Sequence, residues 1–189
     1  MRAKRTLRNK ILPCYQHLFD DNDINIEFLY GTRDSGKSKA GGQLLVYDYT
    51  KIGKDFKGVL IRKVKDTIKD SVYSNVVSII DEWKLLELFN TTKSPLEIRS
   101  VIDNGIILSR GLDEVGKIKS LSNPTHALLD EGDQVTSDDF TTLLTTFRHN
   151  TIKIKFIFMF NPELPVGIQK KEDWWLYKDW FSHTDKKSF

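Results

Sequence analysis

The feature that most constrains this chain is an eight-residue loop, residues 31–38, between an apolar run and a helix-compatible segment. Its sequence, GTRDSGKS, matches the pattern G-x-x-x-x-G-K-[ST]. Glycines let such a backbone curl until successive N–H groups converge on phosphate oxygens, and the following helix directs its positive end to the same point. A surface turn with a coincidental spacing is the alternative. The pattern favours a phosphate-binding strand–loop–helix unit.

The side chains of this loop indicate specific contacts with a nucleotide. Lys37 is expected to reach the β- and γ-phosphates, and the Ser38 hydroxyl to coordinate Mg²⁺. Arg33 either senses the γ-phosphate, lies at an interface, or is an exposed loop arginine. Asp34 must point away from a polyphosphate or weaken its binding, because like charges repel. The expected nucleotide-binding residues of the loop are Gly31, Thr32, Arg33, Asp34, Ser35, Gly36, Lys37 and Ser38.

The composition indicates a single globular domain. A chain of 189 residues can bury one core and is too short for two ordinary domains. No run approaches the length of a membrane span, and the N-terminus lacks the apolar core of a signal peptide. Cys14 is the one cysteine, which excludes a disulfide framework and favours a reducing cytoplasm. The net charge of +3 is partly concentrated in a basic arm, residues 1–10, which either contacts a polyanion such as DNA or is solvated.

Hydrophobic spacing predicts alternating strands and helices. Strands are expected at residues 24–30, 58–64 and 152–162, the last ended by Pro162, and a short helix or turn at 11–19. Helices are expected at residues 37–51, 66–89 (one helix or two), 137–149 with Ser137 as cap, and in the aromatic tail 171–181. Residues 96–111 read as a β-hairpin with Asn104 and Gly105 as its turn. This alternation predicts an α/β fold with a mainly parallel sheet, covered on both faces, and an antiparallel addition.

Polar residues are expected at the ends of two further strands. Asp130 and Glu131 follow a short apolar run, and they would emerge at the carboxyl end of the sheet, where ligands of open α/β sheets bind. Asp130 would hold the Mg²⁺ shell and Glu131 would polarise an attacking water. Asn161 ends the strand at 152–162 and could contact the γ-phosphate or that water, or simply bridge into a turn. A water-activating carboxylate favours an NTP hydrolase over a small-molecule kinase, which must exclude water.

With three motifs in order, the sequence resembles the ATPase domain of the large terminase subunits of tailed bacteriophages, in particular their PBSX-like subgroup. The similar strings are YGTRDSGKS, LIRKVKDTIKDSVYSNV, RGLDEVGKIKSL, ALLDEGDQVTSDDF, FRH and FNP, which cover nearly the whole chain. The most specific of these is RGLDEVGKIKSL, since other phosphate-binding loops are not followed by it. Thr32 and Asp34 stand where this family commonly has glycine, a departure that bears on nucleotide affinity.

The resemblance implies an ASCE-type P-loop fold and an ATP hydrolase that uses ATP and Mg²⁺ to translocate double-stranded DNA into a procapsid. It implies Walker A roles for Lys37 and Ser38, Walker B roles for Asp130 and Glu131, a coupling role for Asn161 and a catalytic role for the loop residue Arg33. Implied partners are duplex DNA, the portal protein and the small terminase subunit, in the cytoplasm of an infected bacterium. The domain would form a homo-oligomeric ring when assembled or be a monomer in isolation, with no membrane association.

Two further roles come from the resemblance alone. Gln16 occupies roughly the place of an adenine-sensing glutamine, although it could equally be a solvated helix residue. Terminases of this type are similar in using a basic residue of a neighbouring subunit to stabilise the transition state, and a long cation suits that purpose. The candidates are Arg110 and Lys119, which flank the most specific string, followed by Lys117 and Arg148.

The resemblance also sets limits on the expected function. Large subunits of this family normally continue into a nuclease domain, whereas this chain stops in a tryptophan-rich tail, about residues 165–189. We therefore expect one P-loop ATPase domain over residues 1–189, from an excised domain or a truncated gene product, without nuclease activity. Two other functions remain open: a nucleotide- or DNA-binding module with little catalysis, and a helicase-type ATPase stimulated by single strands.

Overall fold

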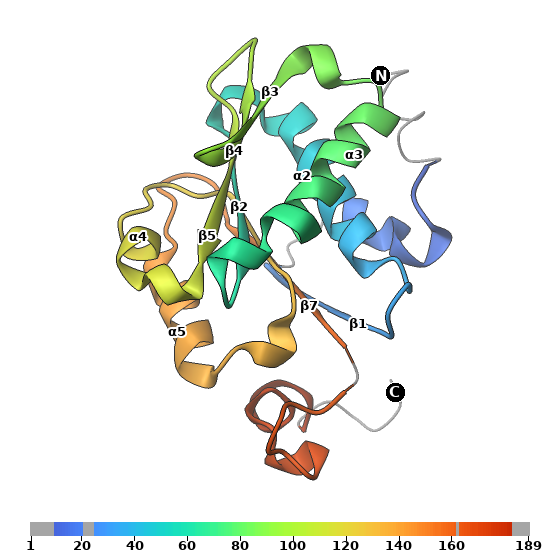
Figure 1. Ribbon diagram of the computed structural model, residues 1–189, viewed down its shortest axis with the longest axis vertical. Coiled ribbons are helices and arrows are strands. Elements are labelled where there is room, and N and C mark those ends of the chain that lie inside the picture. The colour runs from blue at the N-terminus through green and yellow to red at the C-terminus, as the bar shows by residue number, and fades with distance from the viewer. Residues whose placement is uncertain (1–9, 21–24, 162, 183–189) are drawn as a thin grey trace.

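A computed structural model describes residues 10–20, 25–161 and 163–182, in which a central sheet is covered by helices (Figure 1). The strands are β1 (Ile26–Tyr30), β2 (Lys57–Arg62), β3 (Phe89–Lys93), β4 (Leu96–Ser100), β5 (Ile106–Gly111), β6 (His126–Leu129) and β7 (Lys155–Phe160). The α-helices of the described part are α2 (Lys37–Ile52), α3 (Ser74–Glu82), α4 (Val115–Lys119) and α5 (Ser137–Thr146). The basic arm up to residue 9 and the strand end at Pro162 lie outside the described residues.

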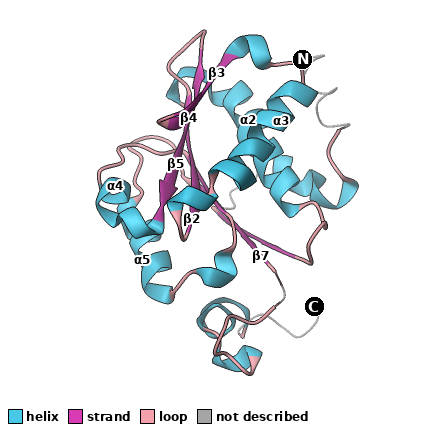
Figure 2. Ribbon diagram, in the orientation of Figure 1, coloured by secondary structure: helices cyan, strands magenta, loops and turns pink. Residues whose placement is uncertain are grey.

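The strand order is β1-β7-β6-β2-β5-β4-β3. The first five strands of this order pair in parallel, and β4 and β3 continue the sheet in antiparallel pairs. Figure 2 distinguishes the strands of the sheet from the helices that flank them. The predicted mainly parallel sheet with an antiparallel addition is confirmed. Because β7 lies between β1 and β6 and all three are parallel, their carboxyl ends lie side by side at one edge of the sheet.

The two faces of the sheet bury separate clusters of apolar side chains. In β6, Leu128 belongs to the cluster under α2 and α3, whereas Ala127 and Leu129 belong to the cluster under α4 and α5. This alternation follows from the two-residue period of a strand. Gly41 lets α2 approach the sheet closely, because a Cβ there would lie 2.7 Å from Cδ1 of Leu128. The fold therefore fixes α2 directly against the strand that leads to the acidic pair.

The prediction of helix over residues 66–89 is wrong at both ends. Residues 65–73 form short 3-10 and π turns, α3 covers only Ser74–Glu82, and Phe89 begins β3. The periodic apolar residues are nevertheless buried, including Ile68, Val76 and Ile79, each 0% exposed. Consecutive short turns can present one face to a core as well as a continuous helix does. The spacing therefore identified the buried face but not the helix ends, and it missed the β3–β4 pair.

The hairpin at residues 96–111 is confirmed as β4 and β5, but its turn differs from the prediction. The loop spans residues 101–105, and neither Asn104 nor Gly105 has a positive φ. Side chains shape the loop instead: Ser100 Oγ accepts from the Asp103 N–H at 3.2 Å, and Asp103 Oδ1 accepts from the Gly105 N–H at 2.8 Å. Such local side-chain bonds replace the positive-φ turn that the Asn-Gly pair indicated.

Thr136, not Ser137, caps α5. The Thr136 hydroxyl accepts from the Asp139 N–H at 3.2 Å, and the Asp139 carboxylate accepts from the Thr136 N–H at 3.1 Å. This reciprocal pair is a capping box. The spacing from residue 136 to the carboxylate at 139 was the available signal, because a capping box needs an acidic or amide side chain three residues after the cap.

The aromatic tail packs against the sheet in the region of β1 and β7, and part of it is helical as predicted. It contains a 3-10 turn, Lys171–Asp173, and a π-helical turn, Tyr177–Phe181. Trp174 and Leu176 are buried with Phe160 of β7, and Phe28 of β1 packs against the same cluster. Among the helices that the structure describes, none combines the length and the apolar character of a membrane span.

Candidate nucleotide-binding site

The loop at residues 31–36 joins β1 to α2 through two left-handed backbone positions. Gly36 has φ +89°, a backbone conformation that favours glycine. A Cβ there would also lie 2.7 Å from Cδ1 of Leu12, so the position has no room for a larger residue. Asp34 has φ 62°, a conformation that aspartate tolerates better than most residues. The loop can therefore curl even though Asp34 stands in place of the usual glycine. Its side chain is exposed, although it borders the cavity described below.

The Lys37 ammonium holds the loop together from inside. Its Nζ donates to the carbonyl oxygens of Gly31 at 2.5 Å and Thr32 at 2.9 Å. It also lies 3.3 Å from Ser35 Oγ and 3.2 Å from Asn161 Oδ1. An ammonium group has three protons, so these four acceptors share them. The structure thus brings the predicted Asn161 at the end of β7 into direct contact with the phosphate-loop lysine.

The electrostatic environment of Lys37 depends on burial and on two acids. Lys37 is 7% exposed, and this burial lowers its pKa because the charged form loses solvation. The carboxylates of Asp130 and Asp133 act in the opposite direction and favour the charged form. The lysine and the acidic strand end are therefore close enough to influence each other, as a common phosphate and metal site requires.

The acidic pair lies directly after β6, at the carboxyl end of the sheet. The Asp130 N–H donates to the Ile61 carbonyl at 2.9 Å, which continues the pairing of β6 with β2 to this residue. Glu131 then takes a left-handed backbone conformation, φ 54°. Non-glycine residues in that region carry strain and are enriched at functional sites. The turn separates the two carboxylates, so Asp130 is buried while Glu131 is half-exposed.

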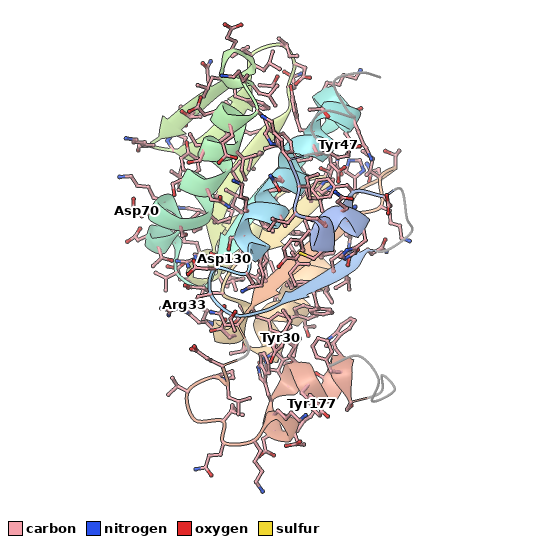
Figure 3. The ribbon with its side chains drawn as sticks, turned by 90° about the vertical axis from the view of Figure 1, so that its right-hand side faces the viewer. Tyr30, Arg33, Tyr47, Asp70, Asp130 and Tyr177 are labelled. Carbon is pink, nitrogen blue, oxygen red and sulfur yellow. The ribbon has the colours of Figure 1, made fainter. Side chains whose placement is uncertain are left out.

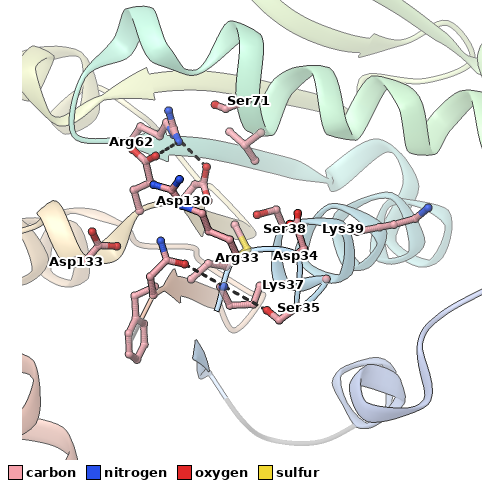
Figure 4. A pocket seen from close by; sticks show the side chains of 16 residues that line it. Arg33, Asp34, Ser35, Lys37, Ser38, Lys39, Arg62, Ser71, Asp130 and Asp133 are labelled. Atoms are coloured by element: carbon pink, nitrogen blue, oxygen red, sulfur yellow. Dashed lines mark hydrogen bonds and ion pairs between the residues drawn. The ribbon is translucent and has the colours of Figure 1, made fainter. Parts of the chain in front are cut away.

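Arg62, at the end of β2, contacts both acids and was not predicted from the sequence. Its Nε lies 3.0 Å from Asp130 Oδ2, and its Nη2 forms an ion pair with Glu131 Oε1 (Figure 4). Its Nη1 also donates to the Thr67 carbonyl at 3.2 Å. The sequence did show a charged residue, Arg62, at the end of an apolar strand. That this strand lies beside β6 is known only from the strand order.

These groups surround one cavity of about 600 Å³. Arg33 and Asp130, which are about a hundred residues apart in sequence, lie near each other at this edge (Figure 3). The predicted residues that line the cavity are Arg33, Asp34, Ser35, Gly36, Lys37, Ser38, Asp130, Glu131 and Asn161. The lining residues that were not predicted are Lys39, Arg62, Ser71, Val72, Asp133, Met159 and Phe160. Gly31 and Thr32 contribute through the carbonyl contacts with Lys37.

The donor set at this cavity fits Mg²⁺. Ser38 supplies a hydroxyl and Asp130 a carboxylate, and Mg²⁺ beside a nucleotide typically takes one or two protein oxygens and completes its shell with phosphates and water. Asp133 adds a carboxylate oxygen, Oδ1, that is buried without a hydrogen-bond partner. The described residues contain no group of three or more acidic, histidine or cysteine side chains placed to hold a metal without a nucleotide.

Gln16 does not line the cavity. It is exposed on the 3-10 helix Pro13–Phe19. The neighbouring Tyr15 hydroxyl donates to the Ser35 carbonyl at 3.0 Å, which fixes this helix against the loop. The adenine-sensing role of Gln16 therefore stays a prediction.

None of the four predicted trans-acting cations lines the cavity of their own subunit. Three are engaged locally: Arg110 Nη1 donates to the Ser109 carbonyl, Lys117 pairs with Glu114, and Arg148 Nε donates to the Thr145 carbonyl. The respective distances are 2.8, 2.6 and 3.2 Å. Lys119 is exposed at the end of α4, and its side chain has no hydrogen bond or ion pair with another residue of the described part.

Comparison with known proteins shows one consistent family. Residues 23–189 match the family described as phage terminase large subunit. The chain is similar to the PBSX phage terminase large subunit of Bacillus subtilis (strain 168), with 30% identity over 181 residues, or 95% of this chain and 39% of that protein.

Solved structures of large terminases share the fold. The bacteriophage HK97 large terminase matches with a TM-score of 0.64 and 16% identity, over 79% of this chain and 33% of that one. The large terminase of a thermophilic bacteriophage, solved in complex with ADP, matches with a TM-score of 0.58 and 11% identity, over 85% of this chain and 38% of that one. The predicted ASCE-type P-loop fold is thereby confirmed. The chain spans well under half the length of these relatives.

Proposed function

The chain belongs to the phage terminase large subunit family, and we propose that it acts as the ATPase motor domain of such a subunit, which hydrolyses ATP with Mg²⁺ to translocate duplex DNA into a procapsid. One observation carries this proposal. The phosphate loop, the acidic pair and Asn161 come from three different segments and converge on a single cavity. The solved relative with bound ADP supports a nucleotide as the ligand.

We assign a task to each group. The backbone amides of residues 31–38 and the Lys37 ammonium bind the β- and γ-phosphates. Ser38 and Asp130 would hold Mg²⁺, which would neutralise phosphate charge when bound. Glu131 orients the attacking water and accepts its proton. Asn161 contacts Lys37, and Arg33 borders the cavity, so both are placed to respond to the γ-phosphate.

Arg62 acts on this machinery from beside it. Its guanidinium holds both carboxylates, which reduces their mutual repulsion and sets the direction of the Glu131 side chain. Glu131 can activate water only when its carboxylate is positioned correctly relative to the phosphate loop, so this contact with Arg62 supports hydrolysis. Arg62 is the described cation that contacts both acids.

The proposal extends to the assembled motor. The domain forms a ring of identical subunits in the cytoplasm of an infected bacterium, with the portal protein, the small terminase subunit and double-stranded DNA as partners. Lys119 is the best-placed of the four trans-acting candidates, because it is exposed and its ammonium is not engaged by the described residues of its own subunit. DNA cleavage is not part of this proposal.

Calorimetry with Mg²⁺–ATP, followed by phosphate release at high protein concentration, tests the proposal. We expect Lys37→Ala to weaken ATP binding at least tenfold, since it removes the phosphate-binding cation. We expect Glu131→Gln to retain binding and to reduce hydrolysis by about 10²- to 10⁴-fold. Glu87→Gln is the matched control, because that carboxylate is exposed in the 3-10 turn Leu86–Leu88 and does not line the cavity.

The outcomes separate the alternative functions. Binding of ATP without any phosphate release by the wild-type chain would favour a nucleotide-binding module. Stimulation by single-stranded DNA without assembly would favour a helicase-type ATPase. Hydrolysis that survives both Lys37→Ala and Glu131→Gln would place the active site elsewhere.

A further inference from the structure

A buried polar cluster lies at the end of the sheet opposite the nucleotide cavity. Its centre is the carboxylate of Asp48 in α2, whose Oδ2 lies 3.0 Å from Nε2 of His126 and 3.7 Å from Nζ of Lys155. His126 is the first residue of β6 and Lys155 the first residue of β7. The cluster therefore joins one helix to two neighbouring parallel strands.

The surroundings of the cluster leave these side chains little freedom. Asp48 is 7% and His126 is 3% exposed. His126 Nδ1 lies 3.1 Å from Thr125 Oγ1, and the His126 ring packs against the Phe56 ring at 5.0 Å between centroids. Lys51, one turn along α2, lies 3.9 Å from Asp48 Oδ1. Since a carboxylate only accepts hydrogen bonds, Nε2 of His126 must carry the proton shared with Asp48.

The three elements that meet in this cluster are the same three that carry the site. α2 begins with Lys37 and Ser38, β6 leads to Asp130 and Glu131, and β7 leads to Asn161. From the rise per residue, the cluster lies about 16 Å along α2 and about 13–20 Å along the strands from these groups. A rigid helix and two rigid strands transmit a displacement at one end to the other end.

We propose that Asp48 and His126 are positioning residues, which set the placement of the phosphate-loop helix relative to the strands that carry Glu131 and Asn161. This inference rests on the proposed function. The phosphate loop is closed on itself by the Lys37 contacts with Gly31 and Thr32, so ground-state phosphate binding does not depend on the remote cluster. Catalysis does depend on it, because Glu131 and Asn161 must face the γ-phosphate that α2 presents.

The test compares two ligands of the full chain: Mg²⁺–ADP and Mg²⁺–ADP–aluminium fluoride, which mimics the transition state. We expect His126→Phe, which keeps a ring against Phe56 but removes both nitrogens, to weaken the fluoride complex at least tenfold and Mg²⁺–ADP less than threefold. His126→Gln retains an N–H at the Nε2 position and should restore most of this difference. Such a selective loss is the signature of lost transition-state complementarity.

Tyr49→Phe is the matched control. Tyr49 is the next residue of α2, is 4% exposed, and donates its hydroxyl to Ser100 Oγ at 2.6 Å. That hydrogen bond ties α2 to the last residue of β4 and not to the strands of the site. We expect Tyr49→Phe to lower the melting temperature without changing the ratio of the affinities for the two ligands. Asp48→Asn replaces His126→Phe in the test if that variant does not fold. It keeps an acceptor for His126 and removes the charge, so it should also weaken the fluoride complex more than Mg²⁺–ADP, by a smaller factor.

The outcomes distinguish this inference from the proposed function. Equal losses of both ligands, no loss in any cluster variant, or the same split in Tyr49→Phe would overturn the positioning role. Wild-type protein that binds neither ligand would overturn the proposed function as well. If the wild-type protein binds both ligands and only the cluster variants lose the fluoride complex selectively, the positioning role and the proposed function are both supported.

Discussion

Arg62 Nε lies 3.0 Å from Asp130 Oδ2, at the point where the neighbouring parallel strands β2 and β6 end. Both side chains are only 12% exposed, so the charges interact with little screening by solvent. The same guanidinium also pairs with Glu131. One cation thus sets the geometry of the metal-binding and the water-activating carboxylate together.

We predict that Arg62→Gln lowers the rate of ATP hydrolysis about tenfold, because Glu131 loses one of two contacts that direct it and retains only part of its catalytic effect. The other contact, from Gln134 Nε2 to Glu131 Oε2 at 3.0 Å, remains. The affinity for Mg²⁺–ATP should change much less, since the phosphate loop is untouched. Steady-state kinetics with separate values of kcat and KM checks this. The control is Lys63→Gln, which removes the adjacent cation and breaks its partly buried pair with Asp139, outside the cavity lining. Equal rates for wild type and Arg62→Gln would contradict the assignment.

Glu27, on β1, gives a prediction about pH. Burial raises the pKa of its carboxyl, and nearby His17 and Lys155 only partly oppose this, while Oε1 is buried without a hydrogen-bond partner. A folded-state pKa above the unfolded value means that the native protein binds this proton more tightly. The contribution of Glu27 to stability is therefore complete below the pKa of the unfolded chain, about 4.5, and is lost as the pH rises through the pKa of the folded protein.

Glu27→Gln should accordingly be more stable than the wild type at pH 7, and this difference should shrink as the pH falls towards about 4. Thermal unfolding across this pH range measures it. Glu87→Gln, at an exposed carboxylate on the same chain, should follow the wild type at every pH. A Glu27→Gln variant that is less stable at pH 7 would show that the carboxylate is stabilised and not penalised by its surroundings.

The cap of α5 can be tested by two adjacent substitutions. Thr136→Ala removes the side-chain acceptor for the Asp139 N–H and should cost about 1 kcal/mol in the free energy of unfolding. Ser137→Ala, one residue later, removes a hydroxyl that does not cap the helix and should cost less than about 0.5 kcal/mol. Chemical denaturation of both variants decides between the two residues. The reverse order of costs would restore Ser137 as the cap.

The aromatic tail should be an integral part of the folded domain. Trp174 and Leu176 are buried, and Trp175 Nε1 donates to the Val135 carbonyl at 2.9 Å. Each large apolar side chain buried contributes about 1.5–3 kcal/mol, so a chain ended at residue 164 should lose several kcal/mol or fail to fold. Val166→Ala is the control, because this tail side chain is fully exposed, and the variant should unfold near the wild-type temperature. If the chain ended at residue 164 matched it in thermal unfolding, the tail would be a separable linker.

Much of the site was readable in the sequence because its parts are local. Curling of the phosphate loop depends on Gly31, Gly36 and the residues between them, and the apolar run before Asp130 specifies a buried strand without reference to the rest of the chain. Alternating strands and helices likewise specify a parallel sheet. These features depend on neighbours within a few residues, so a pattern can carry them.

The tertiary structure decided what depends on residues far apart in sequence. Only the strand order places Arg62 between Asp130 and Glu131, brings Asn161 to Lys37, and gathers Asp48, His126 and Lys155 at the far end of the sheet. The same holds for the extent of α3, since a broken series of turns and a continuous helix bury the same apolar face. Spacing along a chain specifies which face is buried, whereas the contacts between faces are set by packing, which no local pattern encodes.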